Sequence, residues 1–420
     1  MLHGHETDWE VGERKIADLA APGEGTDWLE EPHFSPDGMS VAAVAKLSDD
    51  TCTVRVNGED WPTAFEKVWH VRFSPDGRLT ALVQQDGEWT LAVDGEPWEN
   101  TFEFVWNPLF SADGAHIALC VQSGARYGLA VDDTPWETLF ANANNATLSP
   151  DGRRTAAAVQ TEPLGQAEIE KFEAGVFSAA VDAEPWSRNF VNVWSLAFSP
   201  DSARLAAEVR TAPRECTIAV DGAPWARTYA SVWEPRFSPD GKSVVAPVRQ
   251  GGGWILARDG QKFWDASYVQ LWHQMFSPDG KRIAAIVCPR FGRWTMAVDD
   301  RPWKETFDVV TDAAFSPDGA RLAAAAARDG RWTVLVDGHA WGRSFERVWP
   351  PVFSPDGRHV AALVEEDGRR RLALDGNVLS QARGDVLGFA FSPDGAKILS
   401  TCLDGGACIR RVERLGNGRG

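Results

Sequence analysis

The chain has 420 residues, of which 44% are hydrophobic and 24% are charged, and its formal net charge is -18. This composition is typical of a well-packed globular protein and excludes a disordered chain. An acidic protein repels phosphate backbones, so the charge argues against a nucleic-acid partner and favours a protein partner with a basic surface. Acidic turn residues that serve solubility alone are the alternative explanation.

The N-terminal sequence, MLHGHETDWEVGERK, is polar and lacks the apolar stretch of a secretory signal. No segment approaches the roughly 18 apolar residues that a membrane-spanning helix needs. The six cysteines are scattered along the chain without a C-x-x-C pair, which argues against a zinc or iron–sulfur site. We therefore expect a cytoplasmic protein without a cofactor and without a direct membrane span, peripheral at the inner membrane only through partners.

A five-residue phrase, FSPDG or a close variant, recurs ten times along the chain. It begins at Phe34, Phe73, Phe110, Leu148, Phe198, Phe237, Phe276, Phe315, Phe353 and Phe391. The spacing is 37 to 39 residues, except for one interval of 50 that contains the polar segment 161–175. Such a period indicates a repeat protein, and we expect 161–175 to be an enlarged hairpin loop.

The repeat from Phe73 to Trp106 predicts four short antiparallel strands joined by tight turns. The Ser-Pro-Asp-Gly sequence after Phe73 and the Asp-Gly pairs at 86–87 and 94–95 are turn sequences whose glycines accept positive φ. We expect strands at 71–74, 79–84, 89–93 and, less regularly, 98–104.

The second strand of this repeat is apolar on both faces, as Ala81, Leu82 and Val83 show. A sheet of such strands cannot leave either face in water, so successive sheets must stack. Radial stacking of four-stranded units with a period of about 40 residues gives a β-propeller.

We therefore predict an all-β fold, a β-propeller of ten four-stranded blade-sized units over residues 34–412. Segment 1–33 is expected to complete the closing blade with the C-terminal strands, and 413–420 to form a flexible tail. One large ring is favoured, because the repeats around Phe198 and Phe237 are among the most regular. Two fused smaller propellers are the alternative.

Most of the 20 tryptophans fall into three columns when the repeats are aligned on the phrase. The third-strand tryptophans, which begin the third strand, are Trp89, Trp254, Trp294 and Trp332. The turn tryptophans, which follow the last turn of the repeat, are Trp61, Trp98, Trp136, Trp186, Trp225, Trp264, Trp303 and Trp341. The pre-phrase tryptophans, four residues before the phrase, are Trp69, Trp106, Trp194, Trp233, Trp272 and Trp349.

Each column has an expected role. The third-strand tryptophans are expected in a buried apolar slot, because cysteine or another aromatic residue replaces them in other repeats. The pre-phrase tryptophans are expected to pack between blades, because Trp69, Val71 and Phe73 share one face of an extended strand. The turn tryptophans are interpreted either as packing residues or as candidate docking aromatics for a partner, since tryptophan is enriched at binding hot spots.

Polar residues stand three positions before the phrase in most repeats. We predict that they cluster near the start of one strand per blade, on a rim that binds a partner. Ordinary solvated strand ends are the alternative. These candidate rim residues are His70, Asn107, Asn145, Ser195, Glu234, His273 and Asp312.

Catalytic motifs are missing from the sequence. It contains neither the G-x-S-x-G turn of serine hydrolases nor a phosphate-binding loop that leads from a strand into a helix. The histidines do not form metal-ligand pairs. We expect no enzyme, and no catalytic, cofactor or metal site.

The FSPDG phrase followed by a small apolar strand resembles the WD40-like repeat of TolB-type propellers, although the Gly-His and Trp-Asp elements of true WD40 repeats are absent. The repeated DGxPW and VW elements, as in Gly95–Trp106 and Gly222–Trp233, also resemble the tryptophan-rich cytoplasmic component of the Tmc transmembrane redox complexes. That resemblance implies a cofactor-free accessory subunit of a membrane-bound electron transfer complex, with other protein subunits as partners.

Two classes of function follow from these observations. The first is a non-catalytic protein-interaction or scaffold subunit. The alternative is a propeller that binds a small molecule or carries an unrecognised catalytic site.

Overall fold

The computed structural model describes residues 7–20, 23–379 and 384–416. In these ranges 42 strands form ten antiparallel sheets, eight with four strands and two with five. A short helix, α1 (Ile169–Ala174), lies in the expected loop 161–175. The predicted all-β fold of ten propeller blades is confirmed. No helix among the described residues is long and apolar enough to cross a bilayer.

Blade 2 shows how the repeat folds. Its strands are β7 (Lys67–Phe73), β8 (Leu79–Gln85), β9 (Glu88–Val93) and β10 (Glu96–Pro97), hydrogen-bonded in the order β10-β9-β8-β7. The Asp-Gly pairs at both hairpins have positive φ at both residues, as expected of the tight turns that match the twist of a hairpin.

The aspartate of the last turn also fastens the blade. The backbone N–H of Leu79 donates to the Asp94 carboxylate at 2.9 Å, and the N–H of Asp94 donates to the Leu79 carbonyl at 2.7 Å. The same side-chain bond recurs in eight further blades, with Asn57 as the acceptor in blade 1. This position therefore requires a short side chain that accepts a hydrogen bond and tolerates left-handed backbone.

The serine of the phrase closes its own turn. In blade 3 the Ser111 hydroxyl donates to Asp113 at 2.6 Å and accepts the N–H of His116 at 3.0 Å. Asp113 in turn accepts the N–H of Ala115 at 3.0 Å. The hydrogen bond from the serine is the main reason that the pKa of Asp113 is lowered.

The fourth strand is shorter than expected. In blade 2 it covers Glu96–Pro97, and chain pairing resumes at a bridge between Trp89 and Phe102. Proline has no N–H with which to continue the ladder, and the chain leaves the sheet until the buried aromatic residue returns. This aromatic residue, four positions after the turn tryptophan, is buried in all eight blades that have one, as Phe65, Phe102, Phe140, Phe190, Tyr229, Tyr268, Phe307 and Phe345.

Packing groups the blades into two units. One contains the described residues up to Gly87, Leu91–Trp98 and those from Lys304 onward; the other contains Glu88–Thr90 and Glu99–Trp303. Besides blade 2, the first unit contains a closing blade and blades 1, 8 and 9.

The closing blade consists of β1 (Gly12–Asp18), β40 (Asp385–Phe391), β41 (Lys397–Asp404) and β42 (Ala407–Arg414). Blade 1 consists of β2 (Thr26–Leu29), β3 (His33–Phe34), β4 (Val41–Leu47), β5 (Cys52–Val56) and β6 (Glu59–Asp60). Blade 8 consists of β31 (Val309–Phe315), β32 (Leu322–Arg328), β33 (Arg331–Val336) and β34 (His339–Ala340). Blade 9 consists of β35 (Arg347–Val348), β36 (Val352–Phe353), β37 (Val360–Glu366), β38 (Arg369–Leu374) and β39 (Asn377–Val378).

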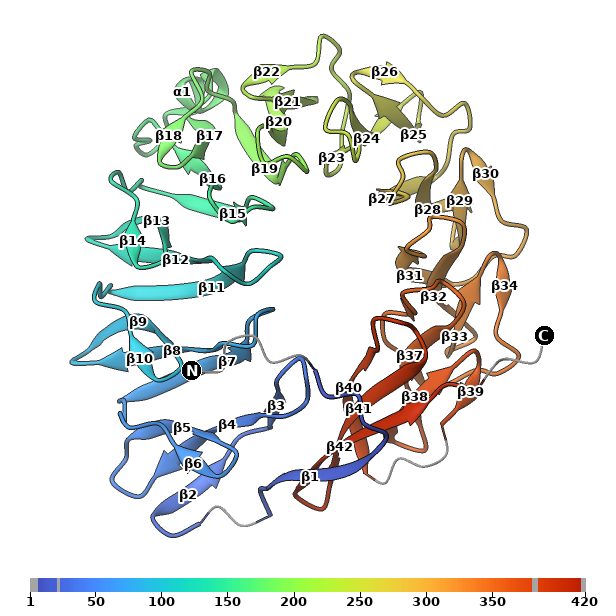
Figure 1. The fold of residues 1–420 in the computed structure, drawn as a ribbon. Coiled ribbons are helices and arrows are strands. Elements are labelled where there is room, and N and C mark those ends of the chain that lie inside the picture. The colour runs from blue at the N-terminus through green and yellow to red at the C-terminus, as the bar shows by residue number, and fades with distance from the viewer. Residues whose placement is uncertain (1–6, 21–22, 380–383, 417–420) are drawn as a thin grey trace. The chain divides into compact units, whose positions relative to one another are not determined.

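The second unit consists of blades 3 to 7 (Figure 1). Blade 3 consists of β11 (Phe104–Phe110), β12 (Ile117–Ser123), β13 (Arg126–Val131) and β14 (Thr134–Pro135). Blade 4 consists of β15 (Ala143–Leu148), β16 (Thr155–Gln160), β17 (Phe177–Val181) and β18 (Glu184–Pro185), and blade 5 of β19 (Asn192–Phe198), β20 (Leu205–Ala212), β21 (Glu215–Val220) and β22 (Ala223–Pro224). Blade 6 consists of β23 (Arg236–Phe237), β24 (Val244–Gln250), β25 (Gly253–Arg258) and β26 (Gln261–Lys262), and blade 7 of β27 (Gln270–Phe276), β28 (Ile283–Arg290), β29 (Arg293–Val298) and β30 (Arg301–Pro302).

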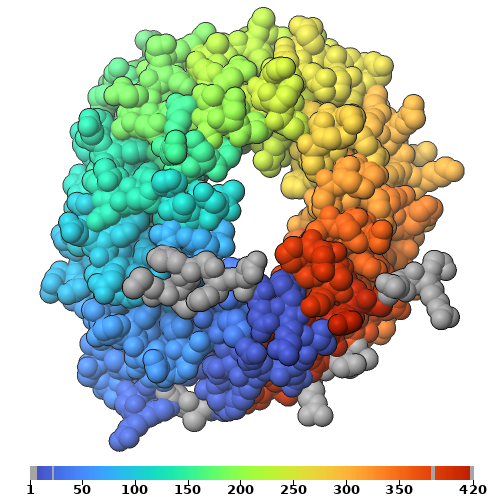
Figure 2. Space-filling model, viewed as in Figure 1, coloured from blue at the N-terminus to red at the C-terminus, as the bar shows by residue number. Residues whose placement is uncertain are grey.

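The two ends of the chain complete one blade. Strand β1 pairs antiparallel with β42, from Gly12 opposite Val412 to Asp18 opposite Ala407. The blue N-terminal strand lies directly against the red C-terminal strands (Figure 2). The rest of segment 1–33 contributes β2 and the start of β3 to blade 1. Strand β42 runs to Arg414, so the expected tail 413–420 begins inside a strand, and 417–420 lie outside the described residues.

The core lies between the blades. The second strands are buried on both faces, and in β32 the six residues from Leu322 to Ala327 are all buried. Apolar residues of blades 4 and 5 form one cluster, in which Ala158 and Phe190 of blade 4 pack with Leu205 and Val209 of blade 5. Face-to-face stacking of sheets therefore removes both surfaces of the central strands from water, as the sequence predicts.

Candidate binding surface

The candidate rim residues occupy a backbone irregularity in the first strand of each blade. In β7, Trp69 is opposite Leu82 and Arg72 is opposite Thr80, so two residues, His70 and Val71, face a single residue of β8. This is a β-bulge, and His70 has the left-handed φ of 56° that such bulges require. The rim residues therefore lie in the middle of the first strand. The prediction that they lie near the start of the strand is wrong.

Six of the seven rim residues share this conformation, with φ between 49° and 56°: His70, Asn107, Asn145, Ser195, His273 and Asp312. Glu234 is the exception. Its blade has a shortened first strand, β23, preceded by a bridge between Val232 and Val248. Asparagine and aspartate tolerate left-handed backbone better than other residues, which accounts for part of the polar pattern without a function.

The bulge also corrects the expected position of the pre-phrase tryptophans. In β7, Val68 and Val71 are both buried although they are three residues apart, because the extra residue reverses the alternation of faces. Trp69 is therefore not on the face of Val71, and it is 48% exposed. Trp233 and Trp272 are each 39% exposed, so these indoles do not pack between blades as expected. The other three are half-buried.

The exposed indoles are held in place by the third-strand aromatics. Trp233 stacks on Trp254 with ring centroids 5.3 Å apart and planes 17° apart. Trp272 stacks on Trp294 at 4.8 Å and 13°. Trp254 is buried and Trp294 is half-buried, in agreement with the buried slot expected for the third-strand column. Trp233 and Trp272 thus each rest on a partner ring of the same blade.

Within each unit, turn tryptophans lie against the last turn of the next blade. Trp136 and Trp264 are buried, and the other six are half-buried. A Cβ atom added to Gly222, in the last turn of blade 5, would lie 3.2 Å from Trp186 Cβ of blade 4. The same contact joins Gly95 to Trp61, and the Trp136 indole N–H donates to the Thr155 hydroxyl at 2.8 Å. Packing explains their positions, and their role as docking aromatics stays a prediction.

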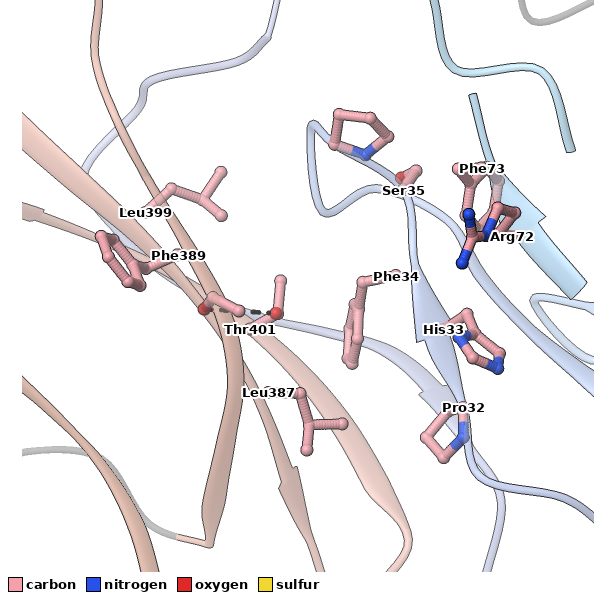
Figure 3. Close-up of a pocket in the computed structure, with 12 residues that line it drawn as sticks. Pro32, His33, Phe34, Ser35, Arg72, Phe73, Leu387, Phe389, Leu399 and Thr401 are labelled. Atoms are coloured by element: carbon pink, nitrogen blue, oxygen red, sulfur yellow. Dashed lines mark hydrogen bonds between the residues drawn. The ribbon is translucent and has the colours of Figure 1, made fainter. Parts of the chain in front are cut away.

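A pocket of about 400 Å³ opens in the first unit where the closing blade meets blades 1 and 2. In Figure 3, Phe34 of β3 points toward Thr401 and Leu387 of the closing blade, and His33 lies on the other side, near Arg72. The Thr401 hydroxyl donates to the Gly388 carbonyl at 3.4 Å, so it is engaged within its own blade. The result is an apolar wall with polar groups along one edge.

Two imidazoles lie at or near the polar edge of this pocket: His33 lines it, and His70 is close enough to His33 and Arg72 to interact with them electrostatically. Desolvation lowers the pKa of His33, against the opposing effect of Glu30 and Glu31. Desolvation also lowers the pKa of His70, and the Arg72 guanidinium and His33 lower it further. Both rings are therefore neutral at physiological pH, and Arg72 is the cation at this edge.

In the second unit, neighbouring rim residues meet in crevices between blades. Asn107 and Asn145 line a cavity of about 470 Å³ between blades 3 and 4, which Trp106 also lines. The Ser195 hydroxyl lies 3.4 Å from the Glu208 carboxylate, and Glu234 repels that carboxylate electrostatically. Glu208 lines a cavity of about 570 Å³ between blades 5 and 6. Asn107 and Asn145 thus share one cavity, while the clustering of the whole rim and its partner-binding role stay predictions.

Glu208 is a site residue that the three tryptophan columns and the rim column do not include. It is the fourth residue of its second strand, opposite Trp194. The equivalent residues of the other blades are Val44, Leu82, Cys120, Ala158, Pro247, Ile286, Ala325, Leu363 and Thr401. A single charged residue in a column of uncharged ones is a signal that the sequence carried, and it marks blade 5 as different.

The described residues contain no group of three or more His, Cys, Asp or Glu side chains that could hold a metal ion. The six cysteines are unpaired, and five of them are buried. Burial raises the pKa of Cys120 and of Cys408 to about 11, so both thiols are neutral packing groups.

Comparison with known proteins adds the following. No family model matches the sequence, and no curated protein matches it. Among 679 matching chains of solved structures is a putative TolB from Agrobacterium tumefaciens, with 18% identity and a TM-score of 0.26, covering 45% of this chain and 74% of that one. TolB from Acinetobacter baumannii has 16% identity and a TM-score of 0.29, covering 74% of this chain and 79% of that one.

These likenesses are too low to carry a functional argument. The ten sheets by themselves establish a β-propeller repeat protein, in agreement with the resemblance of the FSPDG phrase to repeats of that class. The comparisons give no support to the narrower resemblance to the tryptophan-rich component of the Tmc complexes. The function is therefore inferred from the surface of this chain.

Proposed function

We propose that this protein is a non-catalytic interaction propeller, a scaffold subunit that binds a protein partner through the exposed pre-phrase tryptophans of the second unit, Trp233 and Trp272, and the rim residues beside them. The observation that carries the proposal is the exposure of Trp69, Trp233 and Trp272 at equivalent positions of their blades. An indole exposed on the surface does not gain the free energy that burial would give it. Tryptophan is also among the residues most enriched at binding hot spots.

The rings are arranged as a binding surface would need them. Trp233 and Trp272 are already stacked on Trp254 and Trp294, so little side-chain freedom remains to be lost when a partner covers them. Beside Trp272, the bulge at His273 is a backbone feature of a packed sheet. Preorganisation of this kind increases affinity without adding contacts.

The negative charge of the chain favours a partner with a basic surface. With a net charge of -18, the protein attracts a basic surface and accelerates its encounter at low ionic strength. Protein interfaces usually have apolar contacts at the centre and polar or charged contacts at the periphery. The exposed rings would form the centre, and the acidic groups around them the periphery.

The more specific proposal is an accessory subunit of a membrane-bound electron transfer complex, in the cytoplasm and peripheral at the inner membrane. The repeated DGxPW and VW elements are its support. The alternative, a propeller that binds a small molecule, is favoured by the cavity between blades 5 and 6.

The test is capture of the partner with matched variants. The full chain is cross-linked in extract of its native cell, the captured proteins are identified by mass, and the leading candidate is purified and titrated against the chain. We expect a basic partner whose affinity falls on the order of tenfold or more in the double variant Trp233→Ser/Trp272→Ser.

Phe263→Ser is the control, because Phe263 is an aromatic residue of similar exposure, 37%, beside the fourth strand of blade 6. It should leave the affinity unchanged. Equal binding by the wild type and the double variant would refute the proposed surface, and a captured set without components of a redox complex would refute the more specific proposal.

A further inference from the structure

The cavity between blades 5 and 6 is built from residues that depart from the repeat. Besides Glu208, these are Pro213 and Arg214 in the following hairpin, where most other blades have a two-residue turn ending in glycine. All three line the same cavity of about 570 Å³, and so does Arg210, whose equivalents include Lys46 and Arg249. Three departures that converge on one cavity are not expected from random drift of a repeat.

The aromatic wall of the cavity consists of three tryptophans. Trp194 comes from the first strand of blade 5, and Trp233 and its stacking partner Trp254 come from blade 6. Trp254 is almost fully buried, while the Trp233 ring is 39% exposed. An aromatic ligand could extend this stack, since offset-stacked rings attract each other.

The two cations of the cavity form no ion pair with a carboxylate among the described residues. The Arg210 guanidinium lies over the Trp194 ring, 5.2 Å from its centroid. Its Nε–H is buried without a hydrogen-bond partner in the described part of the chain. Arg214 is exposed in the hairpin that lines the same cavity. A guanidinium held flat against an indole presents its remaining N–H groups to a planar anion.

Glu208 completes the polar wall. The Ser195 hydroxyl lies 3.4 Å from its Oε2, Glu234 of the next blade and Arg210 act on it electrostatically, and Cys216 lies close by. Desolvation raises the pKa of Glu208 to about 7, with Glu234 adding to the effect and Ser195 and Arg210 opposing it. The pKa of Cys216 is also raised by burial, so that thiol stays neutral. Below neutral pH the Glu208 carboxyl is a neutral hydrogen-bond donor.

We propose that this cavity binds a small aromatic carboxylate, with its ring stacked on Trp233 and its carboxylate held by Arg210 and Arg214. The cavity volume lies in the range of small-molecule sites, roughly 300 to 1,000 Å³. Protonated Glu208 adds a hydrogen bond to the carboxylate, and ionised Glu208 repels it. This site shares Trp233 with the proposed protein-binding surface but depends on Arg210, Arg214 and Glu208, so either proposal can fail without the other.

The test is calorimetric titration of the full chain with three probes that share a ring and differ in charge: 1-naphthoate, 1-naphthylmethanol and 1-naphthylmethylammonium. We expect naphthoate to bind on the order of tenfold more tightly than the alcohol, and the cation least. The affinity for naphthoate should fall between about pH 5.5 and about pH 8.5, because Glu208 ionises in this interval. Glu208→Gln should flatten that dependence.

Variants locate the binding. Arg210→Met should abolish the preference for naphthoate over the alcohol, and Trp233→Leu should weaken both by about tenfold. Arg290→Met removes an exposed arginine of blade 7 and should change nothing. Stronger binding of the cation or equal binding of all three probes would overturn the proposal. So would a titration in which naphthoate gives no heat, if naphthoate also fails to raise the thermal midpoint of the wild type and of every variant.

Discussion

Replacing a turn tryptophan should destabilise the protein far more than replacing a pre-phrase tryptophan, although both are tryptophans in the same repeat. Trp264 is 2% exposed and packs in a cluster with Leu256 and Tyr268, whereas Trp272 is 39% exposed and contacts chiefly the Trp294 ring. Burying an indole removes roughly 150 to 250 Å² from water, or about 4 to 6 kcal/mol at about 25 cal/mol per Å².

Trp264→Ala removes most of this burial and leaves a cavity, so the free energy of unfolding should fall by about 3 to 5 kcal/mol. Trp272→Ala removes a partly exposed ring and leaves an open surface, so the fall should be about 1 to 2 kcal/mol. Urea unfolding of both variants and the wild type, followed by far-ultraviolet circular dichroism, measures the difference. An equal loss, or a larger loss for Trp272→Ala, would show that the assignment of the two columns is mistaken.

Three further changes test the turns. Gly222→Ala places a Cβ at φ 80° and 3.2 Å from the side chain of Trp186 in the preceding blade, and it should lower the thermal midpoint more than Gly58→Ala, where φ is 96° and nothing lies within 4 Å. Asp221→Ala should cost about 1 to 2 kcal/mol in urea unfolding and Asp221→Asn much less, because asparagine keeps the acceptor and the left-handed backbone. Acid should weaken the protein through the phrase aspartates, because the hydrogen bond from the Ser277 hydroxyl is the main cause that lowers the pKa of Asp279 to about 2 from its ordinary value of 3.8. The resulting stability is present above about pH 4 and lost as the pH falls toward 2. Ser277→Ala should reduce this loss in a pH series of thermal melts, and an unchanged series would contradict the linkage.

The local structure of this protein follows from its sequence. The Ser-Pro-Asp-Gly and Asp-Gly elements determine the turns because few residues accept their backbone angles. Strands that are apolar on both faces, such as Leu322–Arg328, require sheets on either side. The ten-fold recurrence of these signals predicts ten blades, and the incomplete repeats at the two ends predict that they share one.

The faces of the first strand depended on tertiary structure. A strict alternation places Trp69 with Val71, and a single left-handed residue at His70 reverses that relation. A bulge depends on the pairing with the neighbouring strand, so a strand considered alone does not reveal it. The same limit applies to Glu208, which stands out in the aligned repeats but acquires its raised pKa from burial and from Glu234 of another blade. Sequence periodicity thus determines which elements form, while exposure, charge state and the shape of a cavity are properties of neighbours that only folding brings together.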